Sequence, residues 1–167
     1  IILYVGSEHP RKKIAVALRV FAQLRKHNPE ALFIKIGEPG LAAGRIELLD
    51  IVGRLRLQQA VRLIRYASTE RLNELYNRAT ALIFPSRFEG FGLPPLEAMA
   101  AGLPVVCSNA TSLPEVVGEA ALTRYPDDVD GFAQDLERVI TDQALRQRLR
   151  VAGLTQGQEV TFLGVTK

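Results

Sequence analysis

Short, almost uninterrupted apolar runs alternate along the chain with segments whose apolar residues recur with the period of a helix. The runs lie at residues 1–5, 32–36, 60–64, 81–84 and 104–107, and residues 120–123 form a candidate sixth. Runs of this length are typical of strands that are covered on both faces, as in a parallel sheet. The pattern therefore predicts a parallel sheet of about six strands.

The intervening segments indicate helices. Between the first two runs, a helical stripe is formed by Ile14, Leu18, Phe21 and Leu24. A further helix follows Ser68, a residue type favoured at an N-cap, and another holds Pro95 in its first turn and ends at Gly102. Because strands and helices alternate, we expect a Rossmann-like, three-layer α/β/α domain with right-handed crossovers.

The C-terminal part carries two more amphipathic patterns after Asp130, the second of which extends through Leu149. From about Gly153 onward the pattern weakens, because glycines and scattered polar residues interrupt it. The prediction is thus one folded domain over residues 1–153, followed by a poorly ordered or truncated tail over residues 154–167.

Composition narrows the classes of function. The 167 residues, of which 47% are hydrophobic, can form one domain with a sizeable core. A net charge of only +3, with basic and acidic residues interspersed, argues against a nucleic-acid partner. No run approaches the roughly 18 apolar residues of a membrane span. The single Cys107 allows no internal disulfide and is best interpreted as a small buried hydrophobic residue.

The most informative stretch follows the fourth apolar run and reads Glu-Gly-Phe-Gly-Leu-Pro-Pro-Leu-Glu from Glu89 to Glu97. Its glycines permit positive φ and a close approach of the backbone to a ligand. Amides at the start of the following helix could then point at an anion, helped by the helix dipole. These amides belong to Phe91, Gly92 and Leu93. The alternative is a glycine turn followed by a glutamate that merely complements the dipole.

Two glutamates of this stretch suit neutral hydroxyl groups better than phosphate. Glu89 would be repelled by a bound anion, so it is better suited to accept hydrogen bonds from sugar hydroxyls. Glu97 lies in the first helical turn, from which it could reach a ribose. A ligand that contains both sugar and phosphate would satisfy the glutamates through its hydroxyls and the backbone amides through its phosphate.

A basic cluster, Arg11-Lys12-Lys13, follows the first apolar run. Cations at the start of a helix oppose its dipole, and an anionic ligand would resolve that conflict. A solvated basic turn is the alternative. Ligands of open α/β sheets bind beyond the carboxyl ends of the strands, and both loops fall on that edge.

Three other patterns are poorer candidates. Asp128 and Asp130 resemble an acidic metal-binding pair, but they open an amphipathic helix, so capping accounts for them better. His9 and His27 are too isolated for a metal site or a catalytic triad. No G-x-G-x-x-G pattern follows the first run, which disfavours a nicotinamide dehydrogenase.

The stretch from Glu89 to Glu97 resembles the E-x7-E signature of retaining GT-B glycosyltransferases of the group 1, or family 4, type. Other segments agree with that resemblance: residues 4–6 with the basic cluster after them, 75–79, 81–86 and 113–118. The similarity spans about residues 2–150. It implies transfer of a glycosyl unit from a nucleotide diphosphate sugar, with retention at the anomeric carbon and without a cofactor or metal.

The resemblance also implies roles for individual residues. Lys12 aligns with the basic residue that holds the donor diphosphate, and Arg11 is its neighbour; Glu89 and Lys12 would be the catalytic residues. The donor-binding set would comprise Arg11, Lys12, Gly90, Phe91, Gly92, Leu93 and Glu97. Two positions depart from the family pattern, because Ser7 stands where an arginine is frequent and Arg65 where a glycine frames the nucleotide base.

The resemblance further implies that the chain is the C-terminal, donor-binding half of a two-domain enzyme, with acceptor binding left to an N-terminal domain. Such a half should be inactive alone. We expect a cytoplasmic protein whose membrane association, if any, comes through regions outside this chain. A catalytically inactive nucleotide-binding module and a GT-B phosphorylase or epimerase are the alternatives.

Overall fold

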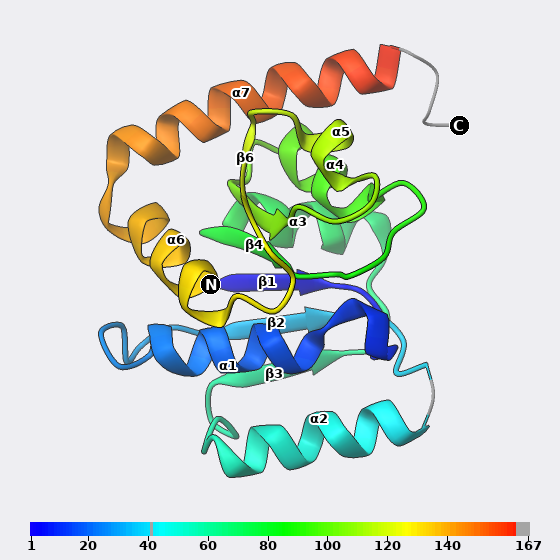
Figure 1. Ribbon diagram of the computed structural model, residues 1–167, viewed down its shortest axis with the longest axis vertical. Helices are drawn as coiled ribbons and strands as arrows, with labels where there is room; N and C mark the ends of the chain where they lie inside the picture. The colour runs from blue at the N-terminus through cyan, green and yellow to red at the C-terminus, as the bar shows by residue number, and fades with distance from the viewer. Residues whose placement is uncertain (41, 163–167) are drawn as a thin grey trace.

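The computed structural model describes residues 1–40 and 42–162, and contains a six-stranded sheet in which every adjacent pair of strands is parallel (Figure 1). The strands are β1 (Ile2–Val5), β2 (Phe33–Ile36), β3 (Val61–Ile64), β4 (Ala81–Phe84), β5 (Val105–Ser108) and β6 (Ala121–Arg124). Their order across the sheet is β3-β2-β1-β4-β5-β6. The predicted strands are confirmed, each with bounds within one residue of the apolar run.

Helices cover both faces of the sheet, which confirms the three-layer α/β/α prediction (Figure 1). One face packs against α1 (Ile14–Leu24), α2 (Ala42–Arg54) and α6 (Val129–Thr141). The other packs against α3 (Thr69–Arg78), α4 (Leu93–Ala100) and α5 (Leu113–Val117), with α7 (Gln143–Phe162) lying along α4. A short 3-10 helix, η1 (Pro10–Lys12), precedes α1.

The sequence pattern did not predict α2. Its buried face carries Leu48 and Ile51, but Ile46 and Leu49 are 69% and 53% exposed. Apolar residues therefore lie on both sides of the helix, and the amphipathic pattern that identifies a surface helix is lost.

Over residues 154–162 the structure has a helix where the sequence pattern indicates a tail, because α7 continues through Gly153 to Phe162. The glycines that weaken the pattern lie where α7 meets α4. A Cβ at Gly153 would lie 3.4 Å from Met99, and a Cβ at Gly157 would lie 2.9 Å from the Cα of Ala100. These glycines permit a close helix–helix contact. Residues 163–167 of the predicted tail lie outside the described residues.

The strand order places the topological switch point between β1 and β4. The chain proceeds from β1 toward β2 and β3 on one side, and from β4 toward β5 and β6 on the other. Loops that follow β1 and β4 therefore meet at the carboxyl edge of the sheet, where such folds bind ligands. The amide of Arg87 donates to the carbonyl of Arg11 at 2.8 Å, which joins the two loops directly.

Candidate functional site

The basic turn after β1 has a backbone that is fixed by specific contacts. His9 is the N-cap of η1 and accepts a hydrogen bond from the Arg11 amide, and the buried Tyr4 hydroxyl donates to the Lys12 carbonyl at 3.1 Å. Lys13 adopts φ 54°, in the left-handed region, and α1 begins at the next residue. Burial, followed by the charge of Glu89, raises the pKa of Tyr4, so its hydroxyl stays protonated and can donate.

Lys12 and Glu89, the two residues that the family resemblance identifies as catalytic, form an ion pair. The Lys12 Nζ lies 2.7 Å from Oε1 and 2.9 Å from Oε2 of Glu89. The side chains are 13% and 9% exposed, respectively, and the ammonium also lies 5.4 Å from the centre of the Phe84 ring. The pair thus joins the loops after β1 and β4 in a partly desolvated position, where electrostatic interactions are stronger than in water.

The backbone of Glu89 is held by two hydroxyl residues from the loop after β5. Its amide donates to Thr111 Oγ1 at 3.1 Å, and its carbonyl accepts from Thr111 at 3.2 Å and from Ser112 at 3.1 Å. Ser112 occupies the N-cap position of α5, but its hydroxyl contacts Glu89 instead of capping that helix. Sequence reasoning missed both hydroxyls, because they lie 22 and 23 residues after Glu89, beyond the motif itself.

The glycine loop leads into the N-terminus of α4. Gly92 is the N-cap residue at φ 94°, and no side chain in the described part of the chain caps this helix end. A Cβ at Gly92 would lie 2.7 Å from Leu113, whereas a Cβ at Gly90 would find no atom within 4 Å. Phe91 is half-buried and Leu93 is exposed. Pro94 and Pro95 in the first turn of α4 carry no N–H, so the amides that can donate to an anion beside this open space are those of Phe91, Gly92 and Leu93.

Glu97 lies on α4 with an exposed side chain, and its Oε2 accepts a hydrogen bond from the Tyr76 hydroxyl of α3 at 2.9 Å. Burial, followed by the charge of Glu97, raises the pKa of Tyr76. Because the donor is buried and stays protonated, it holds one oxygen of Glu97, while the exposed carboxylate can still accept from a ligand.

Other charged residues line the same edge. Arg11 is exposed, and no ion pair involves it among the residues described. Lys13 pairs with Asp127 at 2.8 Å, and Arg87 contacts the same carboxylate. Hydrogen bonds from Lys13 and then Arg87 lower the pKa of Asp127. Arg65 is also exposed and lies 3.3 Å from Glu38.

A buried ionic cluster is formed by Glu8, Lys35 and Arg45 and is hereafter called the Glu8 cluster. Glu8 lies in the loop that leads from β1 to the basic turn. Lys35 Nζ donates to Glu8 Oε1 at 2.8 Å, and Arg45 donates to both carboxylate oxygens at 2.6 and 2.8 Å. Burial opposes ionisation of Glu8, but hydrogen bonds from Arg45 and Lys35 outweigh it and lower the pKa of that carboxyl. Burial lowers the pKa of Lys35, against the opposing effect of Glu8. Sequence reasoning missed this cluster; its signal was a charged Lys35 within an otherwise apolar strand.

Asp128, one of the poorer candidates from the sequence, has a structural role. Asp128 caps α6 by accepting from the Gly131 amide at 2.9 Å, as predicted. Within residues 1–40 and 42–162, no three His, Cys, Asp or Glu side chains gather as a metal site would require. Over the same residues, no helix combines the length and the apolar character that a membrane crossing needs.

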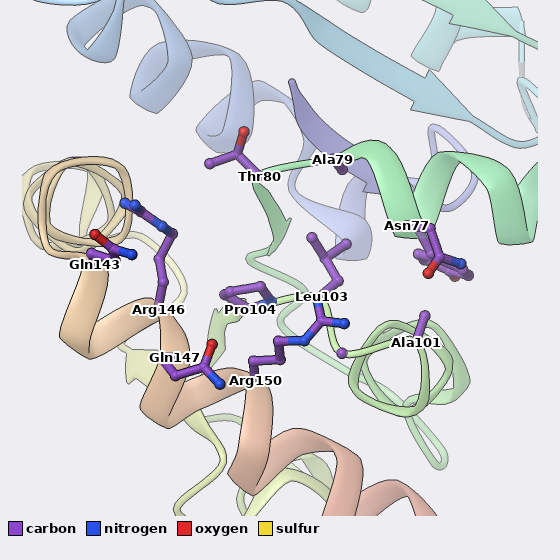
Figure 2. A pocket seen from close by; sticks show the side chains of 12 residues that line it. Asn77, Ala79, Thr80, Ala101, Leu103, Pro104, Gln143, Arg146, Gln147 and Arg150 are labelled. Carbon is purple, nitrogen blue, oxygen red and sulfur yellow. The ribbon is translucent and has the colours of Figure 1, made fainter.

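The polar pocket of Figure 2 lies away from the candidate site. Its volume is about 380 Å³, and its lining includes Thr80, Pro104 and the α7 arginines Arg146 and Arg150. Thr80 and Pro104 immediately precede β4 and β5, so this pocket is at the amino edge of the sheet. The Lys12–Glu89 pair lies at the opposite, carboxyl edge.

Comparison with known structures agrees with this fold. Sucrose-phosphate synthase from Thermosynechococcus elongatus superimposes with a TM-score of 0.84 at 28% identity, over 95% of this chain and 40% of that protein. Anabaena HepE in complex with UDP-glucose also gives a TM-score of 0.84, at 20% identity, over 96% of this chain and 43% of its own. The chain thus has the architecture of one half of a GT-B glycosyltransferase.

Comparison with known sequences gives the family. O-antigen chain mannosyltransferase B of Escherichia coli is 37% identical over 98% of this chain and 43% of its own length. Glycogen synthase of Mycobacterium tuberculosis is 34% identical over 88% of this chain and 35% of its own length. The chain spans less than half of each relative. The family described as "Glycosyl transferases group 1" matches residues 1–155, and the chain therefore belongs to the group 1 glycosyltransferases.

Proposed function

We propose that this chain is the nucleotide-sugar-binding domain of a retaining glycosyltransferase, with the donor bound between the loops that follow β1 and β4. The observation that carries the proposal is the Lys12–Glu89 ion pair beside the open N-terminus of α4. A cation and free backbone amides suit a diphosphate, and the carboxylate suits sugar hydroxyls. Both kinds of group lie at the switch point of the sheet, where ligands of this fold class bind.

Each residue then has a distinct part in the reaction. When the bond between the anomeric carbon and the phosphate oxygen breaks, negative charge develops on the departing diphosphate. Lys12, Arg11 and the amides at the start of α4 stabilise that charge, each well-placed donor contributing about 3 kcal/mol. Glu89 accepts hydrogen bonds from the sugar and orients its ring, and Glu97 holds the ribose. Fixed cations and amides supply the charge stabilisation, so the proposed mechanism uses no metal.

Donor binding requires the Lys12–Glu89 pair to exchange partners. The diphosphate replaces the carboxylate as the partner of Lys12, and sugar hydroxyls replace the ammonium as the partner of Glu89. Truncating Glu89 has two opposing consequences, because it frees Lys12 for the diphosphate and removes the acceptor for the sugar. The sugar-dependent gain in affinity is therefore the informative quantity.

The relatives support two further parts of the proposal. The mannosyltransferase activity in the name of the Escherichia coli relative favours a mannosyl donor. We further propose that acceptor binding belongs to another domain, N-terminal to this one in the whole protein; the chain covers less than half of such relatives, which leaves room for a second domain. This domain alone binds the donor without turning it over. We place the whole protein in the cytoplasm, with membrane attachment only through regions outside this chain.

The test is calorimetric titration of this chain with UDP, GDP and ADP, each free and linked to mannose or glucose. At least one sugar-linked nucleotide should bind more tightly than its free diphosphate, and Glu89→Ala should abolish that gain. Glu119→Ala, at an exposed glutamate before β6, is the matched control and should retain the gain. Absence of binding by every nucleotide would refute the proposal, while binding without any sugar-dependent gain would indicate a catalytically inactive nucleotide-binding module.

A further inference from the structure

The Glu8 cluster is built from three separate segments of the chain. Glu8 follows β1, Lys35 lies on β2, and Arg45 lies on α2. Glu8 and Lys35 are fully buried, and Arg45 is 26% exposed. Buried ion pairs contribute little net stability, because desolvating the charges offsets their attraction. Stability alone is therefore a poor account of why three charged side chains meet here.

The contacts of the cluster fix the loop between β1 and η1. Lys35 Nζ also donates to the Gly37 carbonyl at 2.6 Å, and the amide of Glu8 donates to the Pro39 carbonyl at 3.2 Å. A Cβ at Gly37 would lie 2.6 Å from the Gly6 carbonyl oxygen, so the loops after β1 and β2 are in close contact. The loop that leads to Lys12 is thereby attached to β2 and α2.

The opposite side of the basic turn is held by the loop after β4. The carbonyl of Arg11 accepts from the Arg87 amide at 2.8 Å and from the Ser86 hydroxyl at 3.3 Å. The turn that carries Lys12 is thus supported on one side by the Glu8 cluster and on the other by the segment that leads to Glu89. Two cations and one carboxylate leave the cluster with one positive charge, which does not cancel the positive potential of the turn.

We propose that Glu8 is a positioning residue for diphosphate binding, and that Lys35 and Arg45 hold its carboxylate so that Lys12 faces the ligand. This inference rests on the proposed function, because it assumes that Lys12 binds the diphosphate. Glu8 touches no ligand. It acts through the backbone of the turn, and misplacement of a binding group by about 1 Å is enough to cost much of its effect.

A double-mutant cycle tests the proposal. Glu8→Gln, Lys12→Ala and the double variant are titrated with UDP, GDP and ADP at a temperature where circular dichroism shows every variant to be folded. Glu8→Gln should weaken nucleoside diphosphate binding about tenfold, because Lys12 is no longer held in place. The double variant should bind no more weakly than Lys12→Ala alone. Effects of the two substitutions that simply multiply would overturn the proposal.

The matched control is Asp135→Asn. Asp135 is also a buried carboxylate held by two cations, Arg124 at 2.6 Å and Arg138 at 3.1 Å, but these three residues lie on β6 and α6. Its substitution should lower the unfolding temperature and leave nucleotide affinity unchanged. An equal loss of affinity in Asp135→Asn would show that general destabilisation explains the effect, and would overturn the positioning role.

A milder variant keeps the test decisive if Glu8→Gln does not fold. Arg45→Gln removes two hydrogen bonds to Glu8 and leaves the Lys35–Glu8 pair, so it should weaken binding in the same direction by a smaller factor. Unchanged affinity in Arg45→Gln, or in folded Glu8→Gln, overturns this inference while leaving the proposed function intact. Absence of nucleotide binding by the wild-type chain overturns both.

Discussion

Two glycines of one loop should respond in opposite ways to the same added methyl group. At Gly92 the backbone is left-handed, with φ 94°, and a new Cβ would lie 2.7 Å from Cδ2 of the fully buried Leu113. The left-handed conformation costs alanine about 1 kcal/mol. Overpacking against a buried leucine adds about 1–3 kcal/mol. Gly92→Ala should therefore lower the free energy of unfolding by about 2–4 kcal/mol.

Gly90→Ala is the matched comparison. A Cβ at Gly90 would meet no atom within 4 Å, and Gly90 is not among the positive-φ glycines of the described residues. Alanine there should leave the free energy of unfolding unchanged or raise it by about 0.4–1 kcal/mol, because it restricts the unfolded chain. The open space beside Gly90 is nevertheless where we expect the donor to approach. This variant should bind nucleotide sugar more weakly although it is fully stable.

Urea denaturation followed by circular dichroism measures both stabilities, and calorimetric titration of the folded variants measures binding. The two variants should have similar m-values, so that the shift in midpoint reports stability. The reasoning would be refuted if Gly92→Ala unfolded within about 0.5 kcal/mol of wild type, a shift typical of an unconstrained surface site. It would equally fail if Gly90→Ala were as destabilising as Gly92→Ala.

Two further predictions concern buried titratable groups. Burial raises the pKa of the Cys107 thiol to about 12, so iodoacetamide should label it only through opening of the fold; rapid labelling under native conditions would contradict the buried position. Burial opposes ionisation of Glu8, but Arg45 and Lys35 hold the pKa of this carboxyl in the folded state below its unfolded value of about 4.3. The ionised Glu8 therefore contributes to stability above about pH 4.3, and this contribution is lost as the pH falls through the folded pKa. Urea unfolding measured at falling pH should show this loss in wild type and a shallower decline in Glu8→Gln; identical slopes would argue against a depressed pKa.

The strands could be predicted from the sequence because each is a short apolar run that is covered on both faces. The helices were harder to predict where their apolar residues do not form a single stripe. In α2, the exposed Ile46 and Leu49 obscure the buried face. In α7, Gly153 and Gly157 weaken the helical pattern, although they permit the close contact with α4. A pattern along one segment does not identify the neighbour against which a glycine will pack.

The candidate site could be predicted as far as its residues follow strands. Lys12 and Glu89 come after β1 and β4, and the switch point of the sheet brings their side chains together. The supporting groups were not predictable in the same way. Thr111 contacts Glu89 from the loop after β5, and Glu8 meets partners from β2 and α2. Their roles depend on tertiary contacts, and only a lysine within a buried strand indicated that a partner was needed.

The contact at Gly157 couples the last described helix mechanically to the glycine loop that precedes α4. The helix α4 begins at the Gly92 turn, carries Glu97, and at Ala100 lies so close to α7 that a Cβ at residue 157 would be 2.9 Å from its Cα. The two helices therefore cannot slide past one another independently. A force applied along α7 by any neighbouring domain would be transmitted to α4, and through it to the loop in which we propose that the sugar binds.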